Sequence, residues 1–420
     1  TLIVLPILFK VFDSKEFKRS KLKKGKKHLT VILLLLASSF GFAQNTNMSR
    51  EAVIAKALEN NKGIKAAALQ VNKMQENIKS SFTFEKTNVY YSYDQNNLAL
   101  NNLPLKVFGV QQRFLFPTVY GVQKKANTSE FEKEKADYEL QKNKLSLQVA
   151  KTYEQIVYWQ HQERLYSYLD SLYQNFSKAS DRRFELGETN YLEKITAQSK
   201  YRQIKTKLTQ INFEKKAQYE SLQALVQSDE KISILEKELV PIPTLDTTSN
   251  KAIHTAYLES ISKMYKSQIS LQKQHWLPDL NLEYFQGRNN GLSQSLYGFQ
   301  VGIAVPILFS GNVSKTKVAQ LESQSWEEQK QNQEQKMTQF IRQQQNEIAK
   351  YQESINYYNA TGKKLSEEII KVANSSYKNG EIDFFQYIQS LENAVAIKIE
   401  YVEAVLQFNS NQLELHYLNF

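Results

Sequence analysis

The side chains that most often carry chemistry are few in this sequence, and they are scattered. No pair at metal-ligand spacing occurs among the histidines, which are His28, His161, His254, His275 and His416, and the methionines form no cluster. The absence of cysteine excludes disulfide bonds, thiolate metal sites and a catalytic thiol. The sequence also lacks HExxH, P-loop, GxGxxG and GxSxG motifs. We therefore expect no enzyme activity, no cofactor and no resident metal.

Two short segments, FELGETNYLE and YKNGEIDFFQ, each place one glycine between long polar helical patterns. These glycines, Gly187 and Gly380, are 193 residues apart. Glycine adopts the positive φ that a chain reversal after a helix needs, so both segments are predicted turns. Phe184, Leu186 and Tyr377 beside them are apolar, although solvent alone favours polar residues. We therefore expect these apolar side chains to be exposed and to contact a partner protein. The alternative is that the two glycines only cap their helices and that no partner binds there.

Long helices are predicted on both sides of these turns. No proline falls between residues 118 and 240, or after residue 306, and proline is the residue that most strongly breaks a helix. The patterns run from Val119 to about Ser180 and from Val313 to about Ser376, and about 60 helical residues span about 90 Å. Apolar residues recur at alternating steps of three and four, which is coiled-coil spacing. We expect long helices that pack side by side with one face in water.

Four segments alternate with period two and are predicted strands. Gly298–Val305 is the clearest, and residues 87–94, 108–116 and 280–285 follow the same pattern. Aromatic residues cluster near the strand ends, which favours a membrane barrel over a soluble sheet with the same alternation. Pro117 and Pro306, 189 residues apart, are expected at equivalent strand-to-helix junctions.

The two halves of the chain are predicted to be repeats, 44–250 and 251–420. Each half reads as helix, strand, loop, strand, very long helix, glycine turn and helix. Four strands leave two open edges in lipid, where each unpaired backbone group costs several kcal/mol. Closure needs at least eight strands, so a dimer would give eight and a trimer twelve. The sequence therefore predicts an oligomer.

The N-terminal segment is predicted to target the chain to a membrane. Residues 10–27 hold nine basic and two acidic side chains, which accounts for +7 of the net charge of +11. The apolar run 29–43 follows directly, so we expect a membrane-orienting role and no nucleic-acid partner. This run is signal-like or transmembrane, with a possible cleavage site before Gln44. Residues 1–28 read as the end of an upstream transmembrane segment, which resembles the last helix of resistance-nodulation-division pumps, plus a basic cytosolic linker.

The strand-to-helix junctions and the two glycine turns resemble those of TolC-type outer membrane efflux proteins across residues 44–420. The resemblance implies a mainly α fold with a membrane β-barrel: a homotrimer that completes a twelve-stranded barrel and a long α-helical coiled-coil tunnel. It implies the outer membrane, with its lipid, as the location, and a tunnel that extends into the periplasm. It also implies two partners, a periplasmic adaptor protein and an inner-membrane resistance-nodulation-division pump. The pump-like N-terminus resembles the heavy-metal (CusC/CzcC-like) branch.

The resemblance further implies that the two turns form a tip that docks the adaptor and closes the tunnel. The residues placed there are Arg183, Phe184, Leu186, Gly187, Glu188, Glu193, Tyr377, Gly380, Glu381, Gln386 and Gln389. Tyr377 matches a family tyrosine that helps to hold the closed aperture. Ile382 replaces a family arginine, and Gln386 and Gln389 replace aspartates. A lock is therefore expected to depend on Tyr377 with Glu193 or Arg183.

The predicted function is a passive outer-membrane channel of a tripartite efflux system, with heavy-metal cations as cargo delivered by the pump and adaptor. Two alternatives stay open at this point. One is the outer channel of a protein-secretion or drug-efflux system, which shares the fold. The other is a structural periplasmic coiled-coil protein.

Overall fold

The computed structural model describes residues 47–96, 103–289, 291 and 293–418. By contacts the chain divides into Thr1–Thr46 and Asn47–Phe420, and the second unit is the one described here. The predictions for residues 1–28 and 29–43, and the cleavage site before Gln44, lie outside the described residues. The predicted loops between the strands lie partly outside them.

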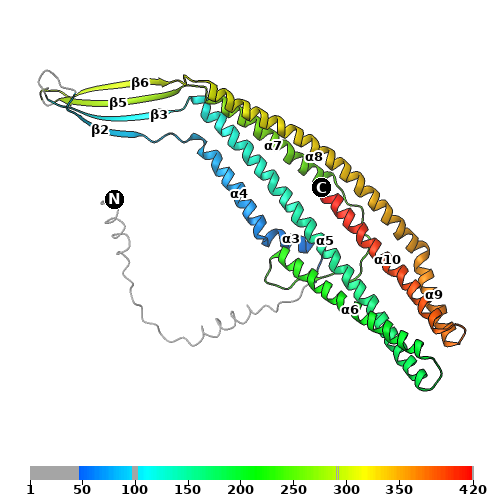
Figure 1. Ribbon diagram of the computed structural model, residues 1–420. Helices are drawn as coiled ribbons and strands as arrows, with labels where there is room; N and C mark the ends of the chain where they lie inside the picture. Colours follow the sequence, from blue (N-terminus) through cyan, green and yellow to red (C-terminus); the bar gives the residue numbers. More distant parts are fainter. Residues whose placement is uncertain (1–46, 97–102, 290, 292, 419–420) are drawn as a thin grey trace, which may run out of the picture. The chain divides into compact units, whose positions relative to one another are not determined.

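Very long helices dominate residues 47–418, as predicted (Figure 1). Helix α5 (Pro117–Glu185) contains 69 residues and is about 100 Å long. It is followed by α6 (Tyr191–Val226). The second long helix differs from the prediction, because α8 (Ser310–Tyr357) passes through a π-helical turn, η2 (Tyr358–Gly362), before α9 (Lys363–Lys378).

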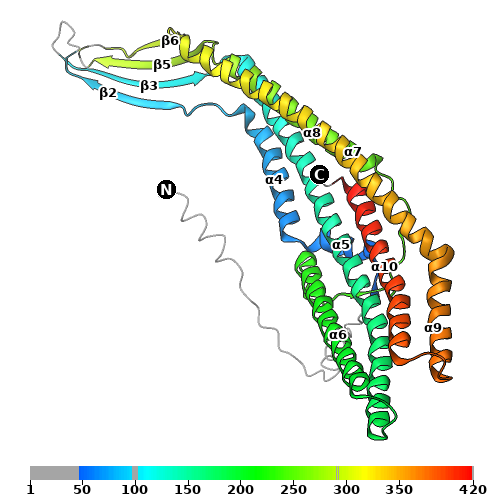
Figure 2. The ribbon, with the colours of Figure 1, turned by 45° about the vertical axis from the view of Figure 1, so that its right-hand side comes forward.

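Shorter elements complete the bundle. Helices α3 (Arg50–Asn60), α4 (Lys62–Lys79) and η1 (Ser80–Phe82) precede the first strands. Helix α7 (Thr248–Gln274) precedes the second pair, and α10 (Phe384–Tyr417) is the last helix. Strand β1 (Asn47–Met48) pairs in parallel with β4 (Ser233–Ile234). Both ribbon views place the sheet at one end of the bundle and the α5–α6 and α9–α10 turns at the other (Figures 1 and 2).

The sheet has four antiparallel strands in the order β2-β3-β5-β6. They are β2 (Asn88–Asp94), β3 (Leu105–Phe114), β5 (Asp279–Asn289) and β6 (Leu296–Ala304). Because directly opposed residues share a face, the register assembles one apolar face from all four strands. Its exposed members are Val89, Tyr91, Tyr93, Phe108, Leu282, Tyr284, Tyr297, Phe299, Val301 and Ile303. The period-two strands are therefore confirmed.

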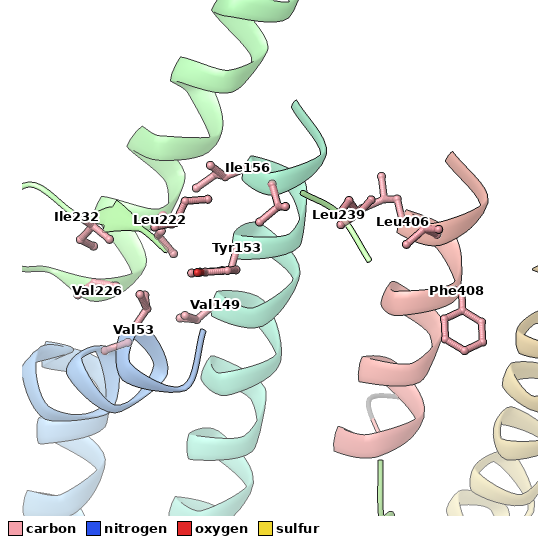
Figure 3. Close-up of a cluster of buried hydrophobic side chains, with 14 of the residues drawn as sticks. Val53, Val149, Tyr153, Ile156, Leu222, Val226, Ile232, Leu239, Leu406 and Phe408 are labelled. Atoms are coloured by element: carbon pink, nitrogen blue, oxygen red, sulfur yellow. The ribbon is translucent and has the colours of Figure 1, made fainter. Parts of the chain in front are cut away.

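The core lies around the middle of α5 (Figure 3). Tyr153 points from α5 toward α3 and α6 and is 1% exposed. Its hydroxyl donates to the Met48 carbonyl oxygen at 2.9 Å and accepts from the Leu235 amide at 3.2 Å. This side chain therefore ties the β1–β4 region to the long helix. Val53, Leu222 and Val226 pack around it.

A buried polar group fastens α10 to the same region. Asn409 Nδ2 donates to Glu154 Oε2 at 2.8 Å and to the Val240 carbonyl oxygen at 2.9 Å, and Asn409 Oδ1 accepts from the Ile242 amide at 2.9 Å. Arg50 Nη1 lies 3.1 Å from Glu154 Oε1. Burial raises the pKa of Glu154, while Asn409 and Arg50 oppose the rise. These bonds satisfy polar atoms that would otherwise be unpaired in the interior.

Candidate functional site

The two glycine turns have the same backbone hydrogen bonds. Gly187 has φ +73°, and the amide of Glu188 donates to the carbonyl oxygen of Arg183 at 2.8 Å. Gly380 has φ +75°, and the amide of Glu381 donates to the carbonyl oxygen of Ser376 at 2.8 Å. In each turn the glycine amide also donates to the carbonyl oxygen three residues earlier, at 3.1 Å. Both helices thus end in a Schellman motif, which places glycine in the left-handed conformation.

The helices that follow begin with side-chain caps. Asn190 Oδ1 accepts from the Glu193 amide at 2.8 Å, and Asp383 Oδ1 accepts from the Gln386 amide at 2.8 Å. Gln386 Oε1 in turn accepts from the Asp383 amide at 3.1 Å, which completes a capping box. Glu193 and Gln386 therefore occupy the same position in their helices, but the Gln386 side chain is engaged in capping.

Arg183 connects the first turn to the second. Its Nη1 lies 3.1 Å from Glu193 Oε1 and 3.1 Å from the Tyr377 hydroxyl oxygen. Thr189 donates to the other Glu193 oxygen at 2.6 Å, and Arg183 Nε lies 3.9 Å from Glu188 Oε2. The structure thus brings together Tyr377, Arg183 and Glu193, the three side chains that the sequence proposed for a lock. Arg183 occupies the central place and donates to both others.

An aromatic stack supports this connection. Phe176 of α5 lies with ring centroids 5.5 Å from Tyr377 and 4.7 Å from Tyr387, and Tyr377 stacks on Tyr387 at 4.8 Å. The Tyr387 hydroxyl donates to Asn374 Oδ1 at 2.5 Å. Burial raises the pKa of Tyr377, opposed by the charge of Arg183, and raises the pKa of Tyr387 to about 12. Both phenols are therefore neutral at physiological pH: Tyr377 accepts from Arg183, and Tyr387 donates to Asn374.

The exposure of the predicted apolar residues requires a correction. Leu186 is 59% exposed, as expected. Phe184 is partly covered by the Lys194 ammonium, 4.8 Å from its ring centroid, and by Tyr191, with ring centroids 5.8 Å apart. Tyr377 is half-buried in the stack with Phe176. The prediction that Phe184 and Tyr377 are exposed was wrong, because side chains of α6 cover Phe184 and Phe176 of α5 covers Tyr377.

Other exposed apolar side chains lie close to the turns in the sequence. They are Tyr191, Leu192 and Ile195 of α6 and Phe385 of α10, which together with Leu186 we call the tip apolar patch. Glu381 accepts from the Ser376 hydroxyl at 2.8 Å, and Gln389 donates to Asn393 at 3.0 Å.

Sequence reasoning missed several residues at this end. Phe176, Phe384 and Tyr387 were not singled out, nor were the caps Asn190 and Asp383. The caps have a readable signal, because Asp383 is followed by glutamine at the third helical position. The aromatic stack has no such signal, since it joins residues about 200 positions apart.

The two proline junctions are not equivalent, which corrects another prediction. Pro117 is in the first turn of α5, where its fixed φ suits a helix and its missing N–H is not needed. Pro306 lies in the segment between β6 and α8, four positions before Ser310. Ile307 and Leu308 in that segment are each 86% exposed. The two prolines therefore mark the strand-to-helix connections, but only Pro117 begins a helix.

Among the described helices, none is long and apolar enough to cross a membrane. No group of three or more His, Asp or Glu side chains in the described parts of the chain is placed to hold a metal ion.

Neither a protein-family model nor a curated protein sequence matches this chain. Solved structures do resemble it. A membrane protein from Pseudomonas aeruginosa superposes with a TM-score of 0.75 at 13% identity, covering 89% of this chain and 92% of that one. CusC gives 0.73 at 15% identity, covering 88% and 92%. The Campylobacter jejuni CmeC outer membrane channel gives 0.72 at 14% identity, covering 96% and 90%. The expected mainly helical fold is therefore confirmed as one that this chain shares with these proteins, while the closed barrel, the trimer and the internal repeat stay predictions.

Proposed function

Taking this channel fold as the starting point, we propose that the chain is one of three identical subunits of the outer-membrane channel of a tripartite efflux system. The observation that carries the proposal is the combination of an apolar-faced sheet with open edges and a long helical bundle that ends in two linked turns. A purely structural coiled-coil protein has no need of such a sheet. Several of the similar solved structures carry the words outer membrane channel in their names, among them those from Campylobacter jejuni and Neisseria gonorrhoeae.

The sheet supports an oligomer because β2 and β6 each pair on one side among the described residues. Open edges cannot persist in lipid, so copies must pair β6 of one subunit with β2 of the next. Three copies supply twelve strands, enough for a barrel with a lumen. In this proposal residues 44–250 and 251–420 are the two repeats, and each contributes two strands.

The apolar face supports an outer-membrane position for the barrel. It continues past β6 into Val305, Ile307 and Leu308, all exposed. At the opposite end of the strands, Lys106 of β3 lies directly opposite Arg288 of β5 on the same face. Cations at one rim of an apolar band suit the anionic headgroup region. The loops after β2 and after β5 then face the cell exterior, and the helices extend into the periplasm.

The two turns are proposed to be the periplasmic aperture. In this closed arrangement the Arg183–Tyr377 hydrogen bond and the Phe176 stack hold the α9–α10 turn against the α5–α6 turn. Opening requires these contacts to separate. The tip apolar patch is proposed to bind the periplasmic adaptor, because solvent-exposed leucine, isoleucine and aromatic side chains gain free energy when a partner covers them.

Heavy-metal cations are the proposed cargo, delivered by an inner-membrane pump that supplies the energy. The support is the pump-like N-terminal sequence. The similarity to CusC does not add to it, because a match at 15% identity shows the fold alone. The channel is proposed to be a passive conduit.

Native mass spectrometry of the detergent-purified protein tests the assembly. We expect a homotrimer that also conducts ions in a planar bilayer. A stable monomer or dimer without conductance would refute the proposed function.

A further inference from the structure

One row of hydrogen-bonding side chains crosses the polar face of the sheet. Asn88, Gln111, Glu283 and Gln300 lie directly opposite one another on β2, β3, β5 and β6. Asn88 Nδ2 lies 3.5 Å from Gln111 Oε1. We call these four residues the amide–glutamate row. Glu283 is its single ionisable member.

A tyrosine two strands away holds the Glu283 carboxylate. The adjacent row on the same face contains Tyr90, Gly109, Phe285 and Gly298. A Cβ atom on Gly109 would overlap the Tyr90 ring, so this ring lies flat across β3 at the glycine. Its hydroxyl thereby reaches β5 and donates to Glu283 Oε1. The ring position and the absence of a side chain at Gly109 together fix the carboxylate on the polar face.

The same packing recurs at the next pair in the row. A Cβ atom on Gly298 would lie 2.5 Å from Phe285 Cζ, so the Phe285 ring lies across β6. Both rings thus lie along the sheet instead of projecting from it. The neighbouring row of amides and carboxylate is therefore not covered by upright aromatic side chains.

Glu283 has a tyrosine, and no basic side chain, as its partner among the described residues. Arg113 lies two positions after Gln111 on β3. Its Nη2 is 2.5 Å from Asp279 Oδ2, and its Nη1 is 3.9 Å from Glu85 Oε2. Arg113 is thus engaged by other carboxylates, and Glu283 forms no ion pair within the described parts of the chain. The row therefore carries a net negative charge.

We propose that Glu283 sets the ion selectivity of the barrel, and that three copies form a carboxylate ring which favours small cations over anions. This inference rests on the proposed function, because the ring exists only if three sheets close around a lumen. Rings of acidic side chains are a general means of cation selection in pores. In a water-filled lumen at 0.1 M salt, mobile ions screen the carboxylate ring only in part. The ring should still change the cation-to-anion permeability ratio by at least about twofold.

The test is the reversal potential of the full-length assembly in a planar bilayer under a KCl gradient. It is measured in a Tyr377→Phe background so that the aperture does not limit the current. We expect this parent to be cation-selective. In Glu283→Gln the cation-to-anion permeability ratio should be at least about twofold lower, and the difference between the two proteins should shrink as the KCl concentration rises. Gln300→Glu adds a second carboxylate to the same row and is expected to raise the ratio. The matched control, Glu328→Gln, removes an exposed glutamate from α8 and is expected to leave the ratio unchanged.

The outcomes separate this inference from the proposed function. Conducting trimers whose reversal potential does not respond to Glu283→Gln or to Gln300→Glu would overturn the role of Glu283 while leaving the channel in place. If Glu283→Gln does not assemble, Gln300→Glu decides alone. A parent protein that forms neither trimers nor channels would defeat both.

Discussion

Arg183 and Tyr377 are 194 residues apart in the sequence, yet Arg183 Nη1 lies 3.1 Å from the Tyr377 hydroxyl oxygen. The contact joins the first glycine turn to the helix that leads into the second. It links the two glycine turns at the same end of the helical bundle, and its charged donor makes it stronger than a neutral hydrogen bond. Its partial exposure to solvent limits that strength. A contact of this kind can hold a closed state and still be released by a binding partner.

Replacing Tyr377 by phenylalanine tests whether this bond holds the aperture. The substitution keeps the stack with Phe176 and removes the hydroxyl, at a loss of about 1 kcal/mol per subunit in the closed state. We expect the basal single-channel conductance or open probability to rise several-fold. The control is Tyr168→Phe on the exposed surface of α5, which should conduct like the parent. Equal conductance in all three proteins would rule out a latch at this position.

The positive φ of Gly187 and Gly380 gives a second prediction. A Cβ atom meets nothing within 4 Å at either glycine, so alanine is disfavoured there by backbone conformation alone. We expect each substitution to destabilise the folded protein by about 1 kcal/mol. Gly121 is the control, because it lies inside α5, is also uncrowded and has no positive φ. Gly121→Ala should stabilise by up to about 1 kcal/mol. Melting temperatures that shift in the same direction for all three would contradict this account.

Asn409 is predicted to be one of the most sensitive side chains outside the tip. Alanine would leave a Glu154 oxygen, the Val240 carbonyl and the Ile242 amide without their partner in a buried site. Such losses destabilise by about 2–4 kcal/mol. Thermal melting of the purified protein should show a clear decrease for Asn409→Ala. The exposed control Asn346→Ala should fall within about 0.5 kcal/mol of the parent, and a similar decrease in both would disprove the role of the buried group.

Glu154 gives a pH dependence with a defined sign. Burial raises the pKa of this carboxyl in the folded protein above its ordinary value of 4.5, so the folded state binds the proton more tightly than the unfolded chain. This contribution to stability is fully present below pH 4.5 and is lost as the pH rises through the folded pKa. We expect the melting temperature of the parent to fall relative to Glu154→Gln over that range. A constant difference between the two proteins across the pH series would contradict the shift.

The long helices and strands were predictable because their signals are local. The absence of proline and the scarcity of glycine between residues 118 and 186 allow a helix as long as α5. Strict alternation from Gly298 onward specified both faces of β6, and the register confirmed it. The glycines of the two turns were identifiable because a helix reversal needs a positive φ.

The remaining features depend on contacts that no local pattern encodes. Gln386 could be assigned to a lumen position by resemblance, but the structure uses it to cap its own helix. The π-helical turn ending at Gly362 places this glycine near Ile397, where a Cβ atom would lie 3.2 Å from Ile397 Cγ2. The stack of Phe176 on Tyr377 and Tyr387 forms only when the two turns meet. These contacts join residues that are far apart in the sequence, so they can be identified only when the packing of the helices is known.

The central claim is that the loop end of the sheet and the two glycine turns lie on opposite sides of the outer membrane. Because the chain contains no cysteine, single-cysteine variants can be labelled without background. The measurement is the reaction of two single-cysteine variants with a polyethylene-glycol maleimide on intact cells. They are Asn97→Cys, three positions after the last residue of β2 in the sequence, and Glu185→Cys, in the last turn of α5. We predict that the first is labelled on intact cells and that the second is labelled only after the outer membrane is permeabilised. Labelling of both on intact cells, or of neither until permeabilisation, would contradict a channel that spans this membrane.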